Sequence, residues 1–442
     1  MARNKGNKMS KHTISDLYQM QGMSLNDKVK MTKRRIQEWV EEYGVDGVYV
    51  SFSGGKDSTV LLTLARELYP DIKGVFVDTG LEYPEIRQFV KTWDNIDWVK
   101  PKMSFKQVIE KYGYPFISKE VAECVYGARK YLTSVIEEME RPDRQTDRQT
   151  DRQTDRQTDR PGEKSLTKRS SKLLTERSAD QKQHHGDSEQ STESLHLKTL
   201  LTKDYEKTID NFRVQRLMGI LPKSGKATME SIPKLPDRSM YSCERYQFFL
   251  DAPFEIAQQC CGVMKKSPMN KYHRETGRQP ITAMMASESR LRTQKWLHQG
   301  CNAFDAKKPM SMPMAFWTEQ DVLLYIYNNK IPIASVYGEV VRDYKADGLM
   351  EGQMTFRDLG GDWEMLDTDR PTLKTTGCER TGCMFCGFGC HLEKPGQGRF
   401  ERMKETHPKQ YDYIMRPKEE GGLNYKEVID WINEHGNLHI RY

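Results

Sequence analysis

The stretch VYVSFSGGKDSTVLL, residues 48 to 62, constrains the fold most strongly. An apolar run is followed by two glycines among small polar residues and then by a second apolar run. Gly54 and Gly55 permit backbone angles and close approaches that a side chain would block. A turn of this kind between a strand and a helix directs backbone N–H groups and the helix N-terminus at one point. The stretch therefore predicts an anion site, with phosphate as the expected ligand.

The side chains of this loop support the same interpretation. Ser53 and Ser58 supply hydroxyl donors, and Lys56 can neutralise phosphate charge. Asp57 would repel a bare phosphate, which indicates a bound magnesium ion or a capping role. The spacing differs from that of the Walker loop, G-x-x-x-x-G-K-[ST]. An ordinary tight turn is the alternative, but the agreement of residues and context favours a phosphate site.

The surrounding sequence alternates between helical and β-rich segments, which is typical of a parallel sheet with covering helices. We predict an α/β fold with a Rossmann-like parallel sheet and helices on both faces. Thr318 is expected to cap the last of the predicted helices, because acidic residues follow it. The helices are predicted at 24–44, 57–69, 83–93, 118–140, 194–219, 287–300 and 317–329, and the strands at 47–53, 73–78 and 279–286.

The middle of the chain differs in composition from both ends. Residues 143–160 repeat DRQT, and few residues after them could enter a core. A four-nucleotide repeat in the gene also produces a four-residue period, which favours an expanded tract over a selected binding element. The predicted organisation is a tail at 1–24, a nucleotide-binding α/β domain at 25–141, a disordered polar insertion at 142–200, the continuation of the α/β domain at 201–345, and a cysteine-rich metal-binding region at 346–442.

The loop also resembles that of a known family. FSGGKDS, followed about twenty residues later by VDTGLEYPE, resembles the PP-loop ATP pyrophosphatases, and within them most closely the phosphoadenosine phosphosulfate (PAPS) reductase family. The segments CCGVMKKSP, TAMMASESRLR and MAFWTEQDVLLYIYNNKIPIASVYG extend the resemblance.

The resemblance implies ATP and Mg²⁺ as cofactors, with ATP cut between its α- and β-phosphates. It implies that the loop binds the β- and γ-phosphates and that Lys56 and Asp57 take part in catalysis. A second group of residues ends the second strand beside the nucleotide, where open α/β sheets bind ligands. The implied nucleotide ligands are Ser53, Gly54, Gly55, Lys56, Asp57, Ser58, Asp78, Thr79 and Gly80.

The chain departs from the family pattern in two places. Met285 replaces the first arginine of the usual G-x-R-A-x-E-S-x-x-R stretch, which leaves Arg292 as the expected anion ligand and a third catalytic candidate. The family's reductases end in a tail with a nucleophilic cysteine, but this chain has no cysteine after Cys390. Because a thiosulfonate mechanism needs that thiolate, the sequence argues against reduction of PAPS by this route.

Six of the nine cysteines form two groups that suggest a metal site. Adjacent Cys260 and Cys261, together with Cys383-x-x-Cys386, resemble the [4Fe–4S] site of the adenylylsulfate reductases in this family. A local set formed by Cys378, Cys383, Cys386 and Cys390 is the alternative, with zinc as the alternative metal. Cys124, Cys243 and Cys301 are interpreted as buried reduced thiols.

Three functions are compatible with these features. The first is an ATP-cleaving enzyme that activates a substrate for sulfur transfer, of the kind that thiolates nucleic acids, with an iron–sulfur centre. The second is a reductase or sulfotransferase acting on a small sulfonucleotide, and the third is a non-enzymatic nucleotide- and cluster-binding subunit. The expected partners are an adenine nucleotide and a nucleic acid or a sulfur-relay protein. The net charge of +6 is compatible with an anionic substrate or a nucleic acid. The N-terminal segment without an apolar region and the lack of a long apolar run predict a cytoplasmic protein without a membrane segment.

Overall fold

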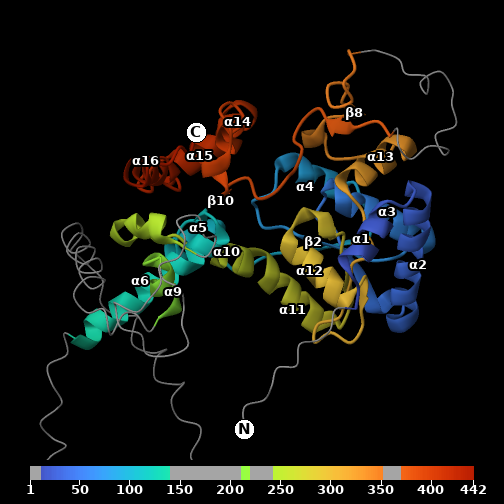
Figure 1. Ribbon diagram of the computed structural model, residues 1–442, viewed down its shortest axis with the longest axis horizontal. Coiled ribbons are helices and arrows are strands. Elements are labelled where there is room, and N and C mark those ends of the chain that lie inside the picture. The colour runs from blue at the N-terminus through green and yellow to red at the C-terminus, as the bar shows by residue number, and fades with distance from the viewer. Residues whose placement is uncertain (1–10, 140–210, 220–241, 352–369) are drawn as a thin grey trace, which may run out of the picture. The chain divides into compact units, whose positions relative to one another are not determined.

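The computed structural model describes residues 11–139, 211–219, 242–351 and 370–442 (Figure 1). The insertion predicted at 142–200 lies outside these residues. The chain forms two compact units. The first contains Met1–Tyr112, Gln259–Gly387 and Glu405–Pro408, and the second contains Gly113–Gln258, Phe388–Lys404 and Lys409–Tyr442. Within the described ranges, every helix is too short or too polar to cross a membrane.

The two units divide the chain differently from the segments that the sequence suggests. The second unit begins at Gly113, inside the predicted segment 25–141. The cysteine-rich region 346–442 is shared, because its described part belongs to the first unit up to Gly387 and mainly to the second beyond it. In the predicted tail at 1–24, the described residues 11–24 contain the helix α1 (Ile14–Gln21).

The described part of the first unit is built on a six-stranded sheet in the order β3-β2-β1-β5-β7-β6. Neighbouring strands run parallel except for β6, which is antiparallel to β7. The strand after β1 in the chain pairs on one side of it and β5 pairs on the other, so β1 lies at the point where the strand order reverses. The strands are β1 (Val48–Ser51), β2 (Gly74–Val77), β3 (Ile96–Val99), β5 (Gln279–Ile281), β6 (Asn302–Ala303) and β7 (Met310–Ser311).

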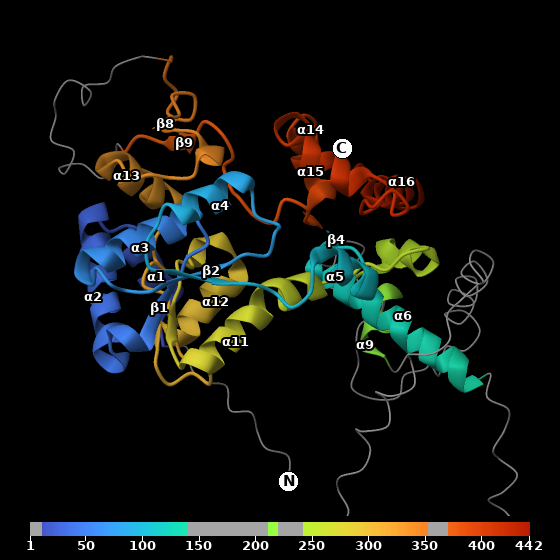
Figure 2. The ribbon, with the colours of Figure 1, turned by 180° about the vertical axis from the view of Figure 1, so that it is seen from behind.

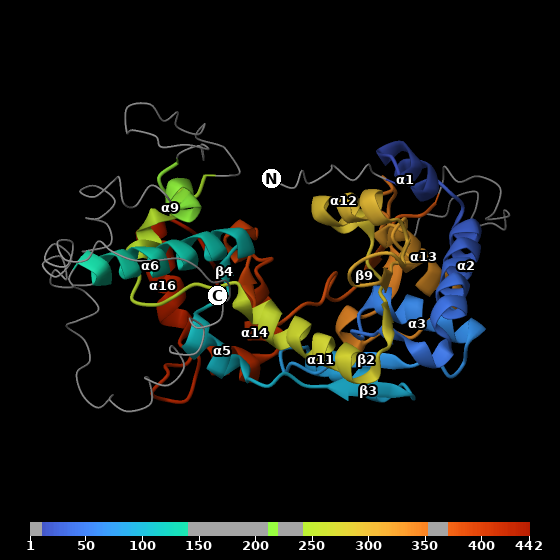
Figure 3. The same ribbon diagram turned by 90° about the horizontal axis from the view of Figure 1, so that it is seen from below.

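Both faces of this sheet are covered by helices, which confirms the predicted fold class. Side chains alternate between the faces of a strand. Val48 and Val50 of β1 accordingly enter the main core cluster, while Tyr49 packs with Val75 and with Tyr272 of α11 (Ser267–Thr276) on the other face. Figure 3 shows α11 beside β2 and β3.

The helices predicted at 24–44, 57–69, 83–93, 287–300 and 317–329 are all present in the first unit, while its helices at Phe105–Tyr112, Gln259–Cys261 and Ser267–Thr276 were not predicted. Figures 1 and 2 show α2 and α3 side by side over the main core. A capping box of Thr318 and Asp321 begins α13, as the sequence predicts. Two further strands, β8 (Val340–Arg342) and β9 (Leu373–Thr375), pair antiparallel. The helices are α2 (Leu25–Tyr43), α3 (Lys56–Leu68), α4 (Pro84–Lys91), α5 (Phe105–Tyr112), α10 (Gln259–Cys261), α12 (Arg290–Gln299) and α13 (Glu319–Asn329).

The described part of the second unit is mainly helical. Its core contains aromatic side chains in tilted and edge-to-face contact, among them Phe116, Phe400 and Tyr425. Figure 3 shows α9 beside α6. Of the helix predicted at 194–219, only α9 lies within the described residues. The elements are β4 (Phe116–Ile117), α6 (Lys119–Met139), α9 (Phe212–Leu217), the 3₁₀ helix η3 (Glu244–Asp251), and α14 (Arg399–Thr406), α15 (Pro408–Met415) and α16 (Tyr425–Gly436), with β10 (Gly387–Phe388) at the boundary.

Candidate nucleotide site

The loop between β1 and α3 requires glycine at its first turn. Gly54 has φ +71°, a conformation that L-residues with side chains rarely adopt. A Cβ atom at this position would lie 2.8 Å from Val90 Cγ2 and 2.9 Å from Ile86 Cγ2, both of α4. Gly54 therefore lets the loop pass directly over α4, and this approach fixes the position of the α3 N-terminus.

We expect Gly54→Ala to destabilise the protein by more than about 1 kcal/mol, because it adds a steric clash to a strained backbone. Gly277→Ala is the matched control, since Gly277 has the same φ of +71° but open space around its Cβ position. Urea unfolding measures both variants. Equal losses would show that the contact with α4 has no energetic effect.

Two serines hold the loop in place by hydrogen bonds within it. The Ser53 backbone N–H donates to Ser58 Oγ at 3.1 Å, and the two hydroxyls lie 3.0 Å apart. The Gly55 backbone N–H donates to Ser53 Oγ at 3.3 Å, and Ser58 Oγ donates to the Gly55 carbonyl at 3.0 Å. The predicted phosphate ligands are thus brought together at the start of α3, where the helix dipole favours an anion.

Lys56 lies beneath a segment that is more than 300 residues away in the chain. Its Nζ donates to the carbonyl oxygen of Glu379 at 2.7 Å and to Glu319 Oε1 at 3.1 Å. Its side chain is 5 % exposed. The ammonium group is therefore held among oxygen acceptors beside the loop, in a position where phosphate oxygens could replace them.

Asp57 lies in a group of charged side chains. Burial raises the pKa of its carboxyl group, while the positive charges of Lys56, Arg380 and Arg292 oppose this shift. Arg292 pairs with Glu288, and Arg380 also lies 3.4 Å from a Glu288 oxygen. The structure thus places the three predicted catalytic residues, Lys56, Asp57 and Arg292, close together. Arg380, which was not predicted, lies beside them.

Tyr337 and Thr381 complete the wall above the loop. The Tyr337 hydroxyl contacts Thr381 Oγ1 and accepts a hydrogen bond from the Lys56 backbone N–H. Burial raises the pKa of Tyr337 to about 12, so its hydroxyl stays protonated at neutral pH. A Cβ at Gly55 would lie 3.3 Å from that oxygen, which explains the second glycine of the pair.

The residues after β2 mostly bind one another. Thr79 Oγ1 donates to Glu82 Oε1 at 2.7 Å, and Arg87 of α4 pairs with Asp78 Oδ2 at 2.9 Å. The second carboxylate oxygen of Asp78 is buried without a hydrogen-bond partner. Gly80 has φ +74° and turns the chain away from the strand. Asp78, Thr79 and Gly80 lie one strand away from the loop, and they do not line the cavity described next.

A cavity of about 260 Å³ opens where β1 and β2 end. Its polar lining includes Ser53 of the loop, Glu82, Lys265 and Thr381. Lys265 Nζ lies 3.9 Å from Glu82 Oε1, so opposite charges face each other across part of the lining. Because this cavity meets the loop at the sheet edge where open α/β folds bind ligands, it is the candidate nucleotide pocket.

The four cysteines predicted as metal ligands come together in the first unit. Burial raises the pKa of Cys260, and the nearby thiols of Cys383, Cys261 and Cys386 raise it further. Burial likewise raises the pKa of Cys383 to about 11, although Lys265 donates a hydrogen bond to its sulfur. In kind, these sulfur donors fit an iron–sulfur centre or zinc.

The arrangement of these thiols is not that of an assembled metal site. Across the described ranges, no group of three or more His, Cys, Asp or Glu side chains has a metal-binding arrangement. Cys390 of the alternative local set belongs to the second unit, and Cys378 lies close to Tyr337.

The helix that carries Cys260 and Cys261 is irregular. After α10 comes one π-helical segment, Gly262–Lys266, and α11 follows without a break. The Ser267 backbone N–H donates to the Gly262 carbonyl, five residues earlier. Such π segments are rare and frequently occur at functional sites.

Sequence reasoning missed several residues around the loop. Glu319 and Tyr337 occur in a segment whose aromatic residues were expected in the core, and Trp317 does lie there, fully buried. Arg380 and Thr381 lie between Cys378 and Cys383, and this segment was considered only for its cysteines, as possible metal ligands. Their one signal in the sequence is an arginine and two glycines in TGCERTGC, residues 376–383.

Two comparisons with known proteins bear on this site. The chain is 40 % identical over 73 residues to an uncharacterized protein, MJ0973, of Methanocaldococcus jannaschii, a match that spans 15 % of this chain and 18 % of that protein. The family model of the phosphoadenosine phosphosulfate reductase domain matches residues 47–130 and 234–387, just over half of the chain. These residues include the glycine loop, Arg292, Lys265 and the four grouped cysteines. The chain therefore belongs to the phosphoadenosine phosphosulfate reductase domain family, a branch of the PP-loop superfamily.

Proposed function

We propose that the first unit binds ATP, cleaves it to AMP and pyrophosphate, and in this way activates a substrate for sulfur transfer. The observation that carries the proposal is the complete SGGKDS loop. Its lysine, aspartate and both serines converge at the N-terminus of α3, beside a cavity that Lys265 also lines. Such an array is suited to the charge of a departing pyrophosphate.

Each residue has a task in this reaction. The loop N–H groups, Ser53 and Ser58 bind the β- and γ-phosphates, and Lys56 exchanges Glu319 for a phosphate oxygen. Arg292 and Arg380 stabilise negative charge that develops as the substrate attacks the α-phosphorus and the bond to the β-phosphate breaks. Magnesium, when bound with ATP beside Asp57, neutralises further phosphate charge.

Product analysis tests this proposal. In protein incubated with ATP and Mg²⁺, water takes the place of the attacking substrate, and AMP and pyrophosphate are expected to form in equal amounts, while Asp57→Ala is expected to form much less. The release of ADP and phosphate in place of AMP would contradict the proposal. An Asp57→Ala variant as active as the natural protein would contradict the role of the loop.

We further propose that Cys260, Cys261, Cys383 and Cys386 bind a [4Fe–4S] cluster. Anaerobically purified protein is expected to be brown with about four irons per chain. Cys260→Ser is expected to lose most of this iron, while Cys301→Ser, the control at a buried thiol beside Trp296, keeps it. Colourless protein with one tightly bound zinc would contradict the cluster.

The family match also favours a second candidate, a reductase or sulfotransferase that acts on a small sulfonucleotide. Sulfite formed from PAPS or adenylyl sulfate in the presence of a thiol would support it. The same assay without AMP or pyrophosphate formation from ATP would replace the first proposal by this one. A nucleic acid or a sulfur-relay protein is the proposed acceptor or partner of the ATP-dependent reaction.

A further inference from the structure

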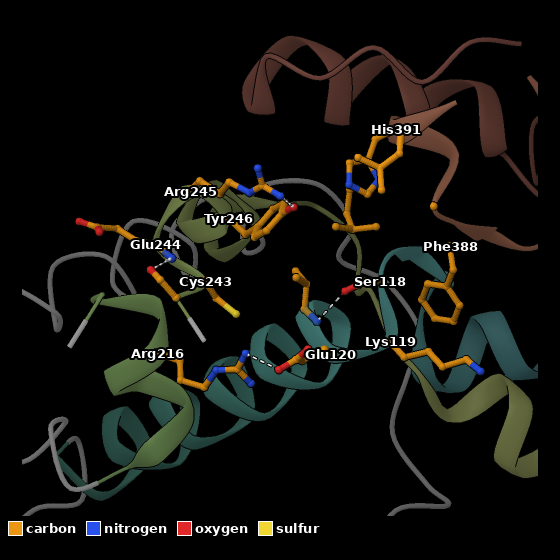
Figure 4. A pocket seen from close by; sticks show the side chains of 15 residues that line it. Ser118, Lys119, Glu120, Arg216, Cys243, Glu244, Arg245, Tyr246, Phe388 and His391 are labelled. Carbon is orange, nitrogen blue, oxygen red and sulfur yellow. Dashed lines mark hydrogen bonds and ion pairs between the residues drawn. The ribbon is translucent and has the colours of Figure 1, made fainter. Parts of the chain in front are cut away.

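The second unit contains a cavity of its own, about 1130 Å³ in volume (Figure 4). Its walls come from the start of α6, from Arg216 of α9, from residues 242–246 and from residues 388–392. Figure 4 shows the Cys243 side chain between α9 and α6, above Arg216 and Glu120. None of these residues takes part in the proposed ATP chemistry.

Cys243 has a second thiol as its neighbour. The side chains of Cys243 and of Cys124, on α6, hydrogen-bond to each other. Both cysteines are also tied to α9, because Cys124 Sγ donates to the Arg213 carbonyl at 3.3 Å and the Cys243 backbone N–H donates to the Arg216 carbonyl at 2.9 Å. Each residue is 1 % exposed. Two thiols are thus held together by a common helix at the wall of a cavity.

Charged groups line the cavity beside this pair. Lys119, Arg216 and Arg245 line the cavity, with Glu120 and Glu244 as its acidic residues. Arg216 pairs with Glu120 at 2.8 Å. Hydrogen bonding with Cys124 lowers the pKa of Cys243, burial raises it, and the charges of Arg216 and Arg245 lower it further. The pKa of Cys124 is raised by the same hydrogen bond and by burial. Cys243 lines the cavity, whereas Cys124 is absent from its lining, so Cys243 is the thiol that a bound ligand meets first and the nucleophile of the pair.

We propose that Cys243 and Cys124 form a redox-active dithiol that is oxidised by exchange with a small acidic disulfide bound in this cavity. The Cys243 thiolate attacks one sulfur of the disulfide RSSR, forms a mixed disulfide and expels RS⁻. Cys124 then attacks the Cys243 sulfur, the Cys124–Cys243 disulfide forms, and the second RS⁻ leaves with the Cys124 proton. The protein loses two electrons and the small disulfide gains them.

The chemical class of the oxidant follows from the lining. An excess of basic side chains favours a ligand with carboxylates, and the volume is ample for a tripeptide disulfide such as oxidised glutathione. Because both thiols are almost fully buried, we expect the exchange to be slow and limited by local opening of the unit. The inference does not depend on the proposed ATP reaction.

Oxidised glutathione is the probe, and peptide mapping by mass spectrometry without reduction is the measurement. Full-length protein incubated with it is expected to form a Cys124–Cys243 cross-link, while Cys301, a buried thiol of the first unit, remains unmodified. In Cys124→Ser the mixed disulfide should persist, with one glutathione on Cys243. In Cys243→Ser neither product should form at these positions.

A second readout covers the case in which a variant folds poorly. The cross-link closes a loop of over a hundred residues, so the oxidised natural protein is expected to melt at a higher temperature than the reduced one. The proposal is overturned if Cys124 and Cys243 remain reduced while the protein is folded and other cysteines react. It is also overturned if glutathione attaches equally to Cys124 in Cys243→Ser.

Discussion

Alanine in place of Lys56 is expected to slow ATP cleavage roughly 10²- to 10³-fold, the loss that follows removal of one preorganised charge-stabilising group. The Nζ atom lies among oxygen acceptors at the mouth of the glycine loop, so a phosphate oxygen gains the same contact. The affinity for ATP is expected to fall less than the rate, because the leaving pyrophosphate carries more charge in the transition state than in bound ATP.

The rate of AMP formation at saturating ATP measures this effect. Lys91→Ala is the matched control, since Lys91 is an exposed lysine on α4 of the same unit. Circular dichroism of each variant shows whether the protein stays folded. If the Lys56→Ala variant kept the natural rate, Lys56 would have no part in catalysis.

Removal of the Asp321 carboxylate is expected to lower the free energy of unfolding by about 3–5 kcal/mol, because it leaves a buried positive charge without its partner. Lys28 Nζ lies 2.7 Å from Asp321 Oδ2, and the two side chains are 1 % and 2 % exposed. Arg370 approaches the other oxygen at 3.1 Å. The same carboxylate accepts from the Thr318 backbone N–H and so caps α13.

Urea unfolding of Asp321→Ala tests this expectation. Asp343→Ala is the control, because Asp343 pairs with Lys374 at 2.9 Å on the surface, where such pairs contribute about 0–1 kcal/mol. The additional variant Lys28→Met with Asp321→Leu replaces the pair by apolar groups and is expected to regain much of the lost stability. Equal losses for the two alanine variants would mean that burial adds nothing to this ion pair.

The local part of the fold could be predicted from the sequence because neighbouring residues determine it. The run from Val48 to Leu62 contains its own strand, turn and helix signals, and the ends of β1 and α3 in the structure lie within two residues of the predicted ones. Thr318 with Asp321 is likewise a capping box that four consecutive residues define.

The rest of the site depends on contacts between distant segments. The Glu379 carbonyl reaches Lys56 only because β9 places the following turn beside Tyr337, whose carbonyl accepts from the Gly377 backbone N–H. The local composition of these segments does not predict that they contact one another. The second unit was also not predicted as a separate unit, because residues before the insertion and residues near the C-terminus fold together to form it.

The π segment at Gly262–Lys266 determines how the turn that carries Cys260 and Cys261 is rotated about the helix axis relative to α11. Tyr272 anchors the other end, because its hydroxyl donates to Asp97 Oδ2 at 2.8 Å and its ring meets Tyr49. One residue of an α-helix corresponds to a rotation of about 100°. A chain shorter by one residue in the π segment would form a regular helix, and Cys260 and Cys261 would then point in another direction by more than a quarter of a circle. The extra residue of the π segment thus determines the direction in which Cys260 and Cys261 point relative to the sheet.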